Sequence, residues 1–220
     1  MQTIWLIVRV RPYEQVGIGV SPARILVLGD STGYGTGATR GFESIEGLIG
    51  QDFPVYHISN VSKNGRTIGE ALATLTELPP TRSYDLILFQ LGGNDILQKR
   101  PLSVVERELR ELCAGAKKMS KHFMMLSCGN VGTAARFAGT SEAILYDSLT
   151  RQFRSMFIRV VAESGGVYID VFKEPAVDVF ALEPRKYLSL DGLHPSTAGY
   201  AVWYSSLGPV VREVLLSQER

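Results

Sequence analysis

The sequence has few of the residues that build disulfide or metal centres. Among its 220 residues are two cysteines, Cys113 and Cys128, and three histidines, His57, His122 and His194. Two cysteines cannot make a disulfide framework, and neither their spacing nor that of the scattered histidines is typical of a zinc site. We therefore expect no metal, no cofactor and two reduced, unreactive thiols.

An excess of charge and a long apolar run are also missing. Lys and Arg number 23 against 22 Asp and Glu, a net charge of +1, which gives no electrostatic reason to expect a nucleic-acid partner. The apolar run at residues 4–8 is interrupted by Arg9. A signal peptide needs about 7–15 apolar residues and a membrane span about 20, so we expect residues 1–23 to be an arm packed on the domain. This predicts a cytoplasmic protein, or a periplasmic or membrane-associated one if the arm is what remains of an anchor.

Composition and periodicity indicate one α/β domain over residues 24–220. Hydrophobic residues make up 45% and charged residues 20%, which are values of globular proteins. Short apolar runs predict strands buried on both faces, and amphipathic stretches between them predict helices. We expect strands at 24–29, 54–59, 86–91, 123–126 and 167–171, and helices at 42–49, 67–78, from about 101, at 141–163 and after 195. Right-handed crossovers then favour a doubly wound, flavodoxin-like three-layer α/β/α sandwich with five parallel strands in the order 2-1-3-4-5.

The loop after the first strand has three interpretations. Residues 33–38 match the G-x-G-x-x-A spacing of a dinucleotide-binding loop, although the second strand does not end in the acid that would hold a ribose. Residues 29–33 match the G-x-S-x-G elbow of α/β-hydrolases, although no H-G-G-G segment accompanies it. The third interpretation is the tripeptide Gly-Asp-Ser itself, at residues 29–31. A nucleotide- or phosphate-binding protein that uses the glycine-rich loop 33–38 is therefore the alternative function.

Other loops at the same edge of the predicted sheet carry polar groups that suit acyl transfer. In an open parallel sheet, ligands bind beyond the carboxyl ends of the strands. Gly65 follows the second strand, Asn94 the third, and Asp191 and His194 the fifth. Together with Ser31 after the first strand, they supply a nucleophile, hydrogen-bond donors and an Asp-x-x-His pair. Acyl transfer from an ester to water needs these parts.

In these four blocks the sequence resembles the SGNH (GDSL-type) hydrolases, from about residue 24 to the final helix. The blocks occur in the order of that family: Gly-Asp-Ser31, the Gly65 loop, Gly-Gly93-Asn94-Asp95 and Asp191-x-x-His194. The resemblance implies a serine esterase that hydrolyses carboxylic or thioesters through an acyl-enzyme, with a small-molecule ester as its partner. Thr32 follows the serine where many members carry Leu or Ile, which changes the pocket wall but not the nucleophile.

The resemblance assigns Ser31 as the nucleophile, His194 as its base and Asp191 as the carboxylate that orients the base. The residues agree with this, because a serine hydroxyl is scarcely ionised at neutral pH and needs a base. His194 is the only histidine placed at a strand-end loop beside a carboxylate. Asp191 precedes it by three residues, which allows one short loop to join the two side chains.

The expected oxyanion hole consists of the backbone N–H groups of Ser31 and Gly65 and the side-chain amide of Asn94. Such donors stabilise the negative charge that develops on the carbonyl oxygen in the transition state. We expect Asp30 and Asp95 to orient loops by hydrogen bonding and not to act as further catalytic acids.

The loop after the fourth strand, residues 129–140, is long for a compact domain, which is typical of lids and binding loops. Its bulky apolar residue, Phe137, is expected to wall an acyl pocket together with Ile96 and Leu97. Such a wall favours short to medium acyl chains, and Arg136 is expected to meet a polar or anionic leaving group. In the alternative interpretation the loop is a connector and Phe137 packs on the core.

Overall fold

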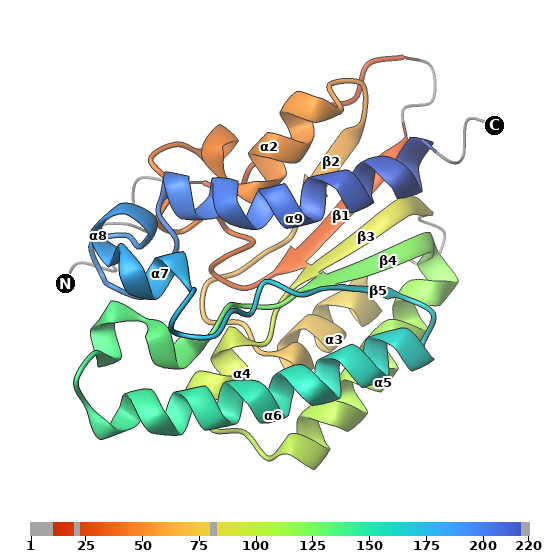
Figure 1. Cartoon of the computed structure of the whole chain (residues 1–220). Helices are drawn as coiled ribbons and strands as arrows, with labels where there is room; N and C mark the ends of the chain where they lie inside the picture. The colour runs from red at the N-terminus through yellow and green to blue at the C-terminus, as the bar shows by residue number, and fades with distance from the viewer. Residues whose placement is uncertain (1–10, 20–22, 80–82, 217–220) are drawn as a thin grey trace.

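Five parallel strands form one sheet at the centre of the molecule (Figure 1). The computed structural model describes residues 11–19, 23–79 and 83–216. The strands are β1 (Arg24–Gly29), β2 (His57–Asn60), β3 (Tyr84–Gln90), β4 (Ser120–Leu126) and β5 (Val167–Ile169). They pair in the order β2-β1-β3-β4-β5. The predicted fold class and strand order are confirmed.

Helices cover both faces of the sheet and make it the middle of three layers (Figure 1). One face is covered by α2 (Ile45–Asp52) and α9 (Thr197–Leu216), the other by α3 (Ile68–Glu77), α5 (Leu102–Met119) and α6 (Ser141–Glu163). Shorter elements lie in the connections: η1 (Gly41–Glu43), α4 (Gly93–Leu97), η2 (Val131–Thr133), η3 (Ala135–Phe137), α7 (Val179–Leu182) and α8 (Pro184–Tyr187).

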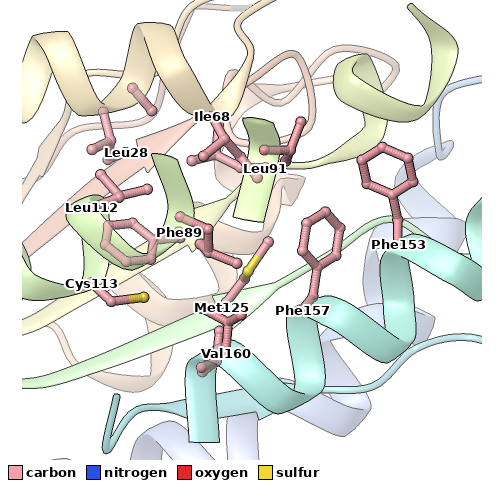
Figure 2. Close-up of a cluster of buried hydrophobic side chains, with 14 of the residues drawn as sticks. Leu28, Ile68, Phe89, Leu91, Leu112, Cys113, Met125, Phe153, Phe157 and Val160 are labelled. Atoms are coloured by element: carbon pink, nitrogen blue, oxygen red, sulfur yellow. The ribbon is translucent and has the colours of Figure 1, made fainter. Parts of the chain in front are cut away.

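Alternating side chains of the central strands fill two separate cores. Leu26 and Leu28 of β1 face α3, α5 and α6, whereas Ile25 and Val27 face α2 and α9. All four are completely buried, and burial of such a side chain contributes about 1.5–3 kcal/mol. Figure 2 shows part of the first core, in which strand residues such as Leu28 and Met125 lie in one cluster with side chains of α5 and α6. The cores hold the sheet rigidly and leave its C-terminal edge free to carry loops.

Several element bounds differ from the prediction. β2 begins at His57 and not at residue 54, because residues 53–56 form a turn that the N–H of Tyr56 closes on the carbonyl of Phe53 (3.1 Å). β5 ends at Ile169, since the carboxylate of Asp170 accepts a hydrogen bond from the N–H of Phe172 (3.2 Å) and turns the chain. The short elements α4, η2, η3, α7 and α8 were not predicted, because three to five residues are too few to show a helical period.

Part of the predicted N-terminal arm lies along the outer edge of β2. The N–H of Gln15 donates to the carbonyl of Ile58 (3.1 Å), and the N–H of Ile58 donates back (2.9 Å), which makes an antiparallel bridge. The side-chain amide of Gln15 also donates to the carbonyls of Phe53 and Tyr56 (2.9 and 2.8 Å). The apolar run at residues 4–8 lies outside the described residues.

Candidate active site

Ser31, His194 and Asp191 meet at the C-terminal edge of the sheet. Ser31 follows the end of β1, and the other two residues lie in the loop that leads into α9. The Nε2 atom of His194 lies 2.8 Å from the Oγ atom of Ser31, and its Nδ1 atom lies 2.6 Å from the Oδ2 atom of Asp191. The imidazole is thus hydrogen-bonded to a hydroxyl on one side and to a carboxylate on the other, which is the arrangement of a serine nucleophile with its base. The structure thus brings the predicted triad residues into contact.

A tight loop holds Asp191 in the orientation that this contact needs. Its Oδ1 atom accepts hydrogen bonds from the hydroxyl of Ser189 (2.8 Å) and the N–H groups of Leu193 (2.9 Å) and His194 (3.0 Å). Burial alone would raise the pKa of Asp191, but the hydrogen bond and charge of His194 and the two backbone donors hold that pKa well below its ordinary value. The carboxylate is therefore charged at neutral pH and can stabilise an imidazolium.

Asp30 joins the nucleophile loop to Asn94. Its Oδ1 atom accepts hydrogen bonds from the N–H and the hydroxyl of Thr32, both at 2.8 Å, and its Oδ2 atom accepts one from the Nδ2 atom of Asn94 at 3.3 Å. The residue is 3% exposed, and burial raises the pKa of its carboxyl to about 6, although the Thr32 donors and the charge of His194 act in the opposite direction. At neutral pH Asp30 is a charged acceptor in the position expected of a loop-orienting residue.

Asp95 connects α4 with α3. Its Oδ2 atom accepts a hydrogen bond from the N–H of Ile68 (3.1 Å), and its Oδ1 atom pairs with the guanidinium of Arg100 (2.7 Å). Both oxygens thus bind structural partners, and the residue is completely buried. This arrangement fixes the loop that carries Gly65 against the helix that carries Asn94.

The three predicted oxyanion-hole donors belong to residues that line one cavity. Gly65 has a φ of +79°, a left-handed value that glycine adopts without strain, and the position of its missing Cβ is open. Within residues 11–19, 23–79 and 83–216, no group accepts a hydrogen bond from the N–H of Ser31 or of Gly65. The Nδ2 atom of Asn94 is held beside them by Asp30 and by the carbonyl of Arg66 (3.2 Å).

The glycine-rich loop 33–38 closes on itself. Four of its N–H groups donate to nearby carbonyls: Tyr34 to Asp30 (2.9 Å), Gly35 to Thr32 (3.1 Å), Thr36 to Ser31 (2.9 Å) and Ala38 to Gly35 (3.1 Å). A phosphate-binding loop directs such groups at its ligand. Because these donors are used inside the turn, the loop is a support for Ser31 and not a phosphate cradle.

A cavity of about 430 Å³ lies over Ser31 and His194. This volume falls in the range of about 300–1,000 Å³ that is usual for small-molecule sites. Most of the wall is apolar and includes Leu97, Val131, Val171, Phe180, Leu193 and Trp203. Apolar walls around a few polar groups suit a ligand with a hydrocarbon part and one polar reacting centre.

The structure places the residues of the predicted acyl-pocket wall in two different surroundings. Leu97 and Arg136 line the cavity, but Ile96 and Phe137 do not. Ile96 is 1% exposed and Phe137 is 7% exposed, and both lie in the core. α4 directs Ile96 inward and its neighbour Leu97 toward the cavity, while the ring of Phe137 packs on Tyr146 with 4.7 Å between centroids. The prediction that Ile96 and Phe137 contact substrate is therefore wrong.

Trp203 and Phe180 line the cavity, although neither was predicted from the sequence to be a site residue. Trp203 lies on the buried face of α9 with Tyr200 and Leu207, so helical spacing identifies it as buried but not as part of a cavity. Phe180 belongs to α7, which is too short to give a periodic signal. Their position depends on tertiary packing.

Both cysteines lie where burial disfavours a thiolate. Burial raises the pKa of Cys113 to about 11 and that of Cys128, which lines the cavity, to about 12. Both thiols are therefore protonated at neutral pH.

Among the residues that the structure describes, no three His, Cys, Asp or Glu side chains form a group able to hold a metal. None of the described helices has the length and apolar character of a membrane span.

Comparisons with known proteins agree on one family. The model of the GDSL-like lipase/acylhydrolase family matches residues 27–202. An arylesterase from Vibrio mimicus is 33% identical to this chain over 109 residues, which cover 47% of this chain and 53% of that protein. The chain thus spans about half the length of this relative.

Solved structures show the same fold at lower identity. TesA is 19% identical with a TM-score of 0.69, and the match covers 87% of this chain and 99% of TesA. A catalytic mutant of an acetylxylan esterase from Geobacillus stearothermophilus is 17% identical with a TM-score of 0.64, covering 91% of this chain and 96% of that protein. At these identities the likeness concerns the three-layer fold.

Proposed function

This chain belongs to the GDSL-like lipase/acylhydrolase family, the SGNH hydrolases, which are enzymes that hydrolyse esters, and we propose that it is itself a serine esterase with Ser31 as nucleophile. The observation that carries the proposal is the pair of contacts made by His194, 2.8 Å to Ser31 Oγ and 2.6 Å to Asp191 Oδ2. The proposed substrates are carboxylic or thioesters of short to medium acyl chains.

The first half of the proposed reaction forms an acyl-enzyme. Ser31 Oγ attacks the ester carbonyl carbon as its proton passes to His194 Nε2, and the charged Asp191 stabilises the resulting imidazolium. The carbonyl oxygen becomes an oxyanion, which accepts hydrogen bonds from the N–H groups of Ser31 and Gly65 and from the Asn94 amide. The bond to the leaving group then breaks, and the departing alcohol or thiol takes the proton from His194.

The second half returns the enzyme to its starting state. A water molecule gives its proton to His194 Nε2 while its oxygen attacks the acyl carbon, and the same donors bind the second oxyanion. The bond between the acyl carbon and Ser31 Oγ breaks, and the serine regains its proton from His194. The products are a carboxylic acid and the free enzyme.

The size of the cavity supports the proposed chain length. About 430 Å³ with a mostly apolar wall holds a short or medium acyl group together with the leaving group. The alternative, a nucleotide- or phosphate-binding protein, has less support, because the N–H groups of loop 33–38 bond within the turn.

A fluorophosphonate probe tests the proposal, since it reacts with an activated serine. We expect one adduct, which peptide mass spectrometry locates at Ser31, and none in Ser31→Ala. Ser206→Ala, which removes an exposed serine of α9, is the matched control and should be labelled like the parent. The proposal fails if the parent is unlabelled, or if Ser31→Ala is labelled and hydrolyses p-nitrophenyl esters at the parental rate.

A further inference from the structure

A pair of completely buried polar side chains lies behind the loop that carries Ser31. Glu46 of α2 and Gln90 at the end of β3 are both 0% exposed. Leu86 and Leu88 of β3 face the core formed with α2 and α9, and alternation along the strand places Gln90 on the same face. The triad does not use either residue.

Gln90 is in direct contact with the strand end that presents the nucleophile. It pairs with Gly29 in the β1–β3 register, and its carbonyl accepts a hydrogen bond from the N–H of Asp30 at 2.8 Å. A Cβ atom at Gly29 would lie 3.2 Å from the Cβ atom of Gln90 and 2.7 Å from the hydroxyl of Ser62. Any movement of Gln90 is therefore transmitted to Gly29 and Asp30.

Two of the four polar side-chain atoms of this pair have no hydrogen-bond partner among the described residues. The Nε2 atom of Gln90 donates to the Oε1 atom of Glu46. The remaining oxygens, Glu46 Oε2 and Gln90 Oε1, are buried and have no partner in the described part of the chain. If Glu46 is ionised, both are acceptors and cannot bond to each other. One proton on Oε2 supplies the missing donor and satisfies both oxygens.

The surroundings favour that proton. Burial raises the pKa of Glu46 to about 8, and the nearby donor groups of its own backbone, Ser44 and Gln90 act in the opposite direction. No described residue forms an ion pair with it.

The charged and titratable groups near this face are acids or are already paired. From α9, Tyr200 interacts with Glu46 and also with Asp30 and Asp191, and all of these carry negative charge when ionised. η1 contributes Glu43, which accepts a hydrogen bond from Thr197, and the N-terminal arm contributes Tyr13, which bonds to Gln15. Of the other ionisable groups of α2 and α9, Tyr204 and Arg212 both bind Asp52, and Glu213 is exposed.

We propose that Glu46 is a positioning residue that acts as a neutral carboxylic acid. Its O–H donates to Gln90 Oε1 while Gln90 Nε2 donates to its Oε1, which closes a two-bond acid–amide pair. This pair holds the end of β3 against Gly29 and thereby fixes the loop of Ser31. The effect on catalysis rests on the proposed esterase function, whereas the protonated pair itself does not.

Substitutions that keep or remove the pair test the positioning role. In Glu46→Gln an amide N–H replaces the acid O–H, so we expect kcat and KM within about twofold of the parent at pH 7. Glu46→Leu has similar bulk but no hydrogen bond, and we expect kcat to fall at least tenfold with little change in KM. Glu111→Gln, at an exposed position of α5, is the control for removing a carboxylate. Equal loss in Glu46→Gln and Glu46→Leu would overturn the proposal.

The pH dependence of unfolding gives a readout without substrate. The unfolded chain releases the Glu46 proton near 4.5 and the folded chain near 8, so parental stability falls as pH rises through that interval. Relative to the parent, the urea midpoint of Glu46→Gln should therefore rise between about pH 4.5 and 8. Above about pH 8 the difference between the two midpoints should stay constant. A difference that does not change with pH would disprove the protonated state.

A direct observation of the proton completes the test. With ¹³C-labelled glutamate, the parent should show one side-chain carboxyl carbon with the chemical shift of a neutral acid at pH 7, and Glu46→Gln should lack that signal. If every glutamate carboxyl has the shift of an ionised group at pH 7, the pair is refuted whether or not the protein hydrolyses esters. If the parent is inactive but shows the signal, the esterase function fails and the acid–amide pair stands.

Discussion

The carboxylate of Asp30 and the side-chain amide of Asn94 meet at 3.3 Å, between Oδ2 and Nδ2. This contact joins the loop after β1 to the first turn of α4. Because the other oxygen of Asp30 holds Thr32, one side chain sets the position of the nucleophile loop and of an oxyanion donor. The contact is longer than most N–H···O hydrogen bonds, so a developing oxyanion can compete for the same amide hydrogen.

Asp30→Asn should change how stability depends on pH. The carboxyl has a folded pKa of about 6, raised from 3.8, so the parent loses stability as pH rises from about 4 through 6, and asparagine does not titrate. Between pH 4 and 7 the unfolding free energy of the variant should rise by about 2.4 kcal/mol relative to that of the parent. Urea unfolding at half-unit pH steps measures this. A constant difference would show that Asp30 ionises with an ordinary pKa.

Asn94→Ala should reduce kcat by about 10²–10³ with little change in KM, because its amide acts mainly on charge that develops in the transition state. Steady-state kinetics on a p-nitrophenyl ester separates the two constants. The thermal midpoint of the variant serves as the control for folding. An effect on KM alone would make Asn94 a substrate-binding residue instead of an oxyanion donor.

Ser31→Ala and His194→Ala should each lower kcat by at least about 10³, and the double variant should be no slower than either single one, since the two residues act as a unit. His122→Ala, which removes a half-buried histidine of β4, and Ser206→Ala are matched controls that should keep parental rates. Ester hydrolysis by the purified, folded variants is the measurement. Losses that multiply in the double variant would argue for independent roles.

Leu97→Ala and Phe137→Ala should have opposite kinds of effect. Leu97 lines the cavity, so its truncation should move the preferred p-nitrophenyl ester toward longer acyl chains. Phe137 is buried in the core, so its truncation should lower the unfolding free energy by about 3–5 kcal/mol and leave the chain-length optimum unchanged. A shifted optimum in Phe137→Ala would place that ring in contact with substrate.

The sequence predicts this fold well where a segment is long or continuously apolar. β1 occupies Arg24–Gly29 and α6 occupies Ser141–Glu163, as expected, because a buried strand and a long amphipathic helix each have a strong pattern. α7 and α8 have four residues each and show no period. Their arrangement depends on packing against the rest of the molecule.

The same contrast holds at the site. Ser31 directly follows β1, and the topology of a parallel sheet alone places such a position at its C-terminal edge, whereas Asp191 and His194 come after α7 and α8, in the loop before α9. Phe137 was misassigned because hydrophobicity does not distinguish a side chain that faces a cavity from one that faces the core. The contact between Glu46 and Gln90 could not be predicted for a related reason. Ile45 and Ile49 mark the buried face of α2, but only the tertiary structure places the carboxyl of Glu46 opposite Gln90.

The bridge between Gln15 and Ile58 limits the main-chain hydrogen-bonding groups that the outer edge of β2 exposes to other molecules. β2 is an outermost strand, and unpaired main-chain groups on such a strand recruit strands from neighbouring chains. Gln15 occupies the N–H and carbonyl of Ile58, and its amide covers the carbonyls of Phe53 and Tyr56. A chain shortened to begin at Ala23 would lack the bridge to Ile58, and copies of it would associate edge to edge as their concentration rises.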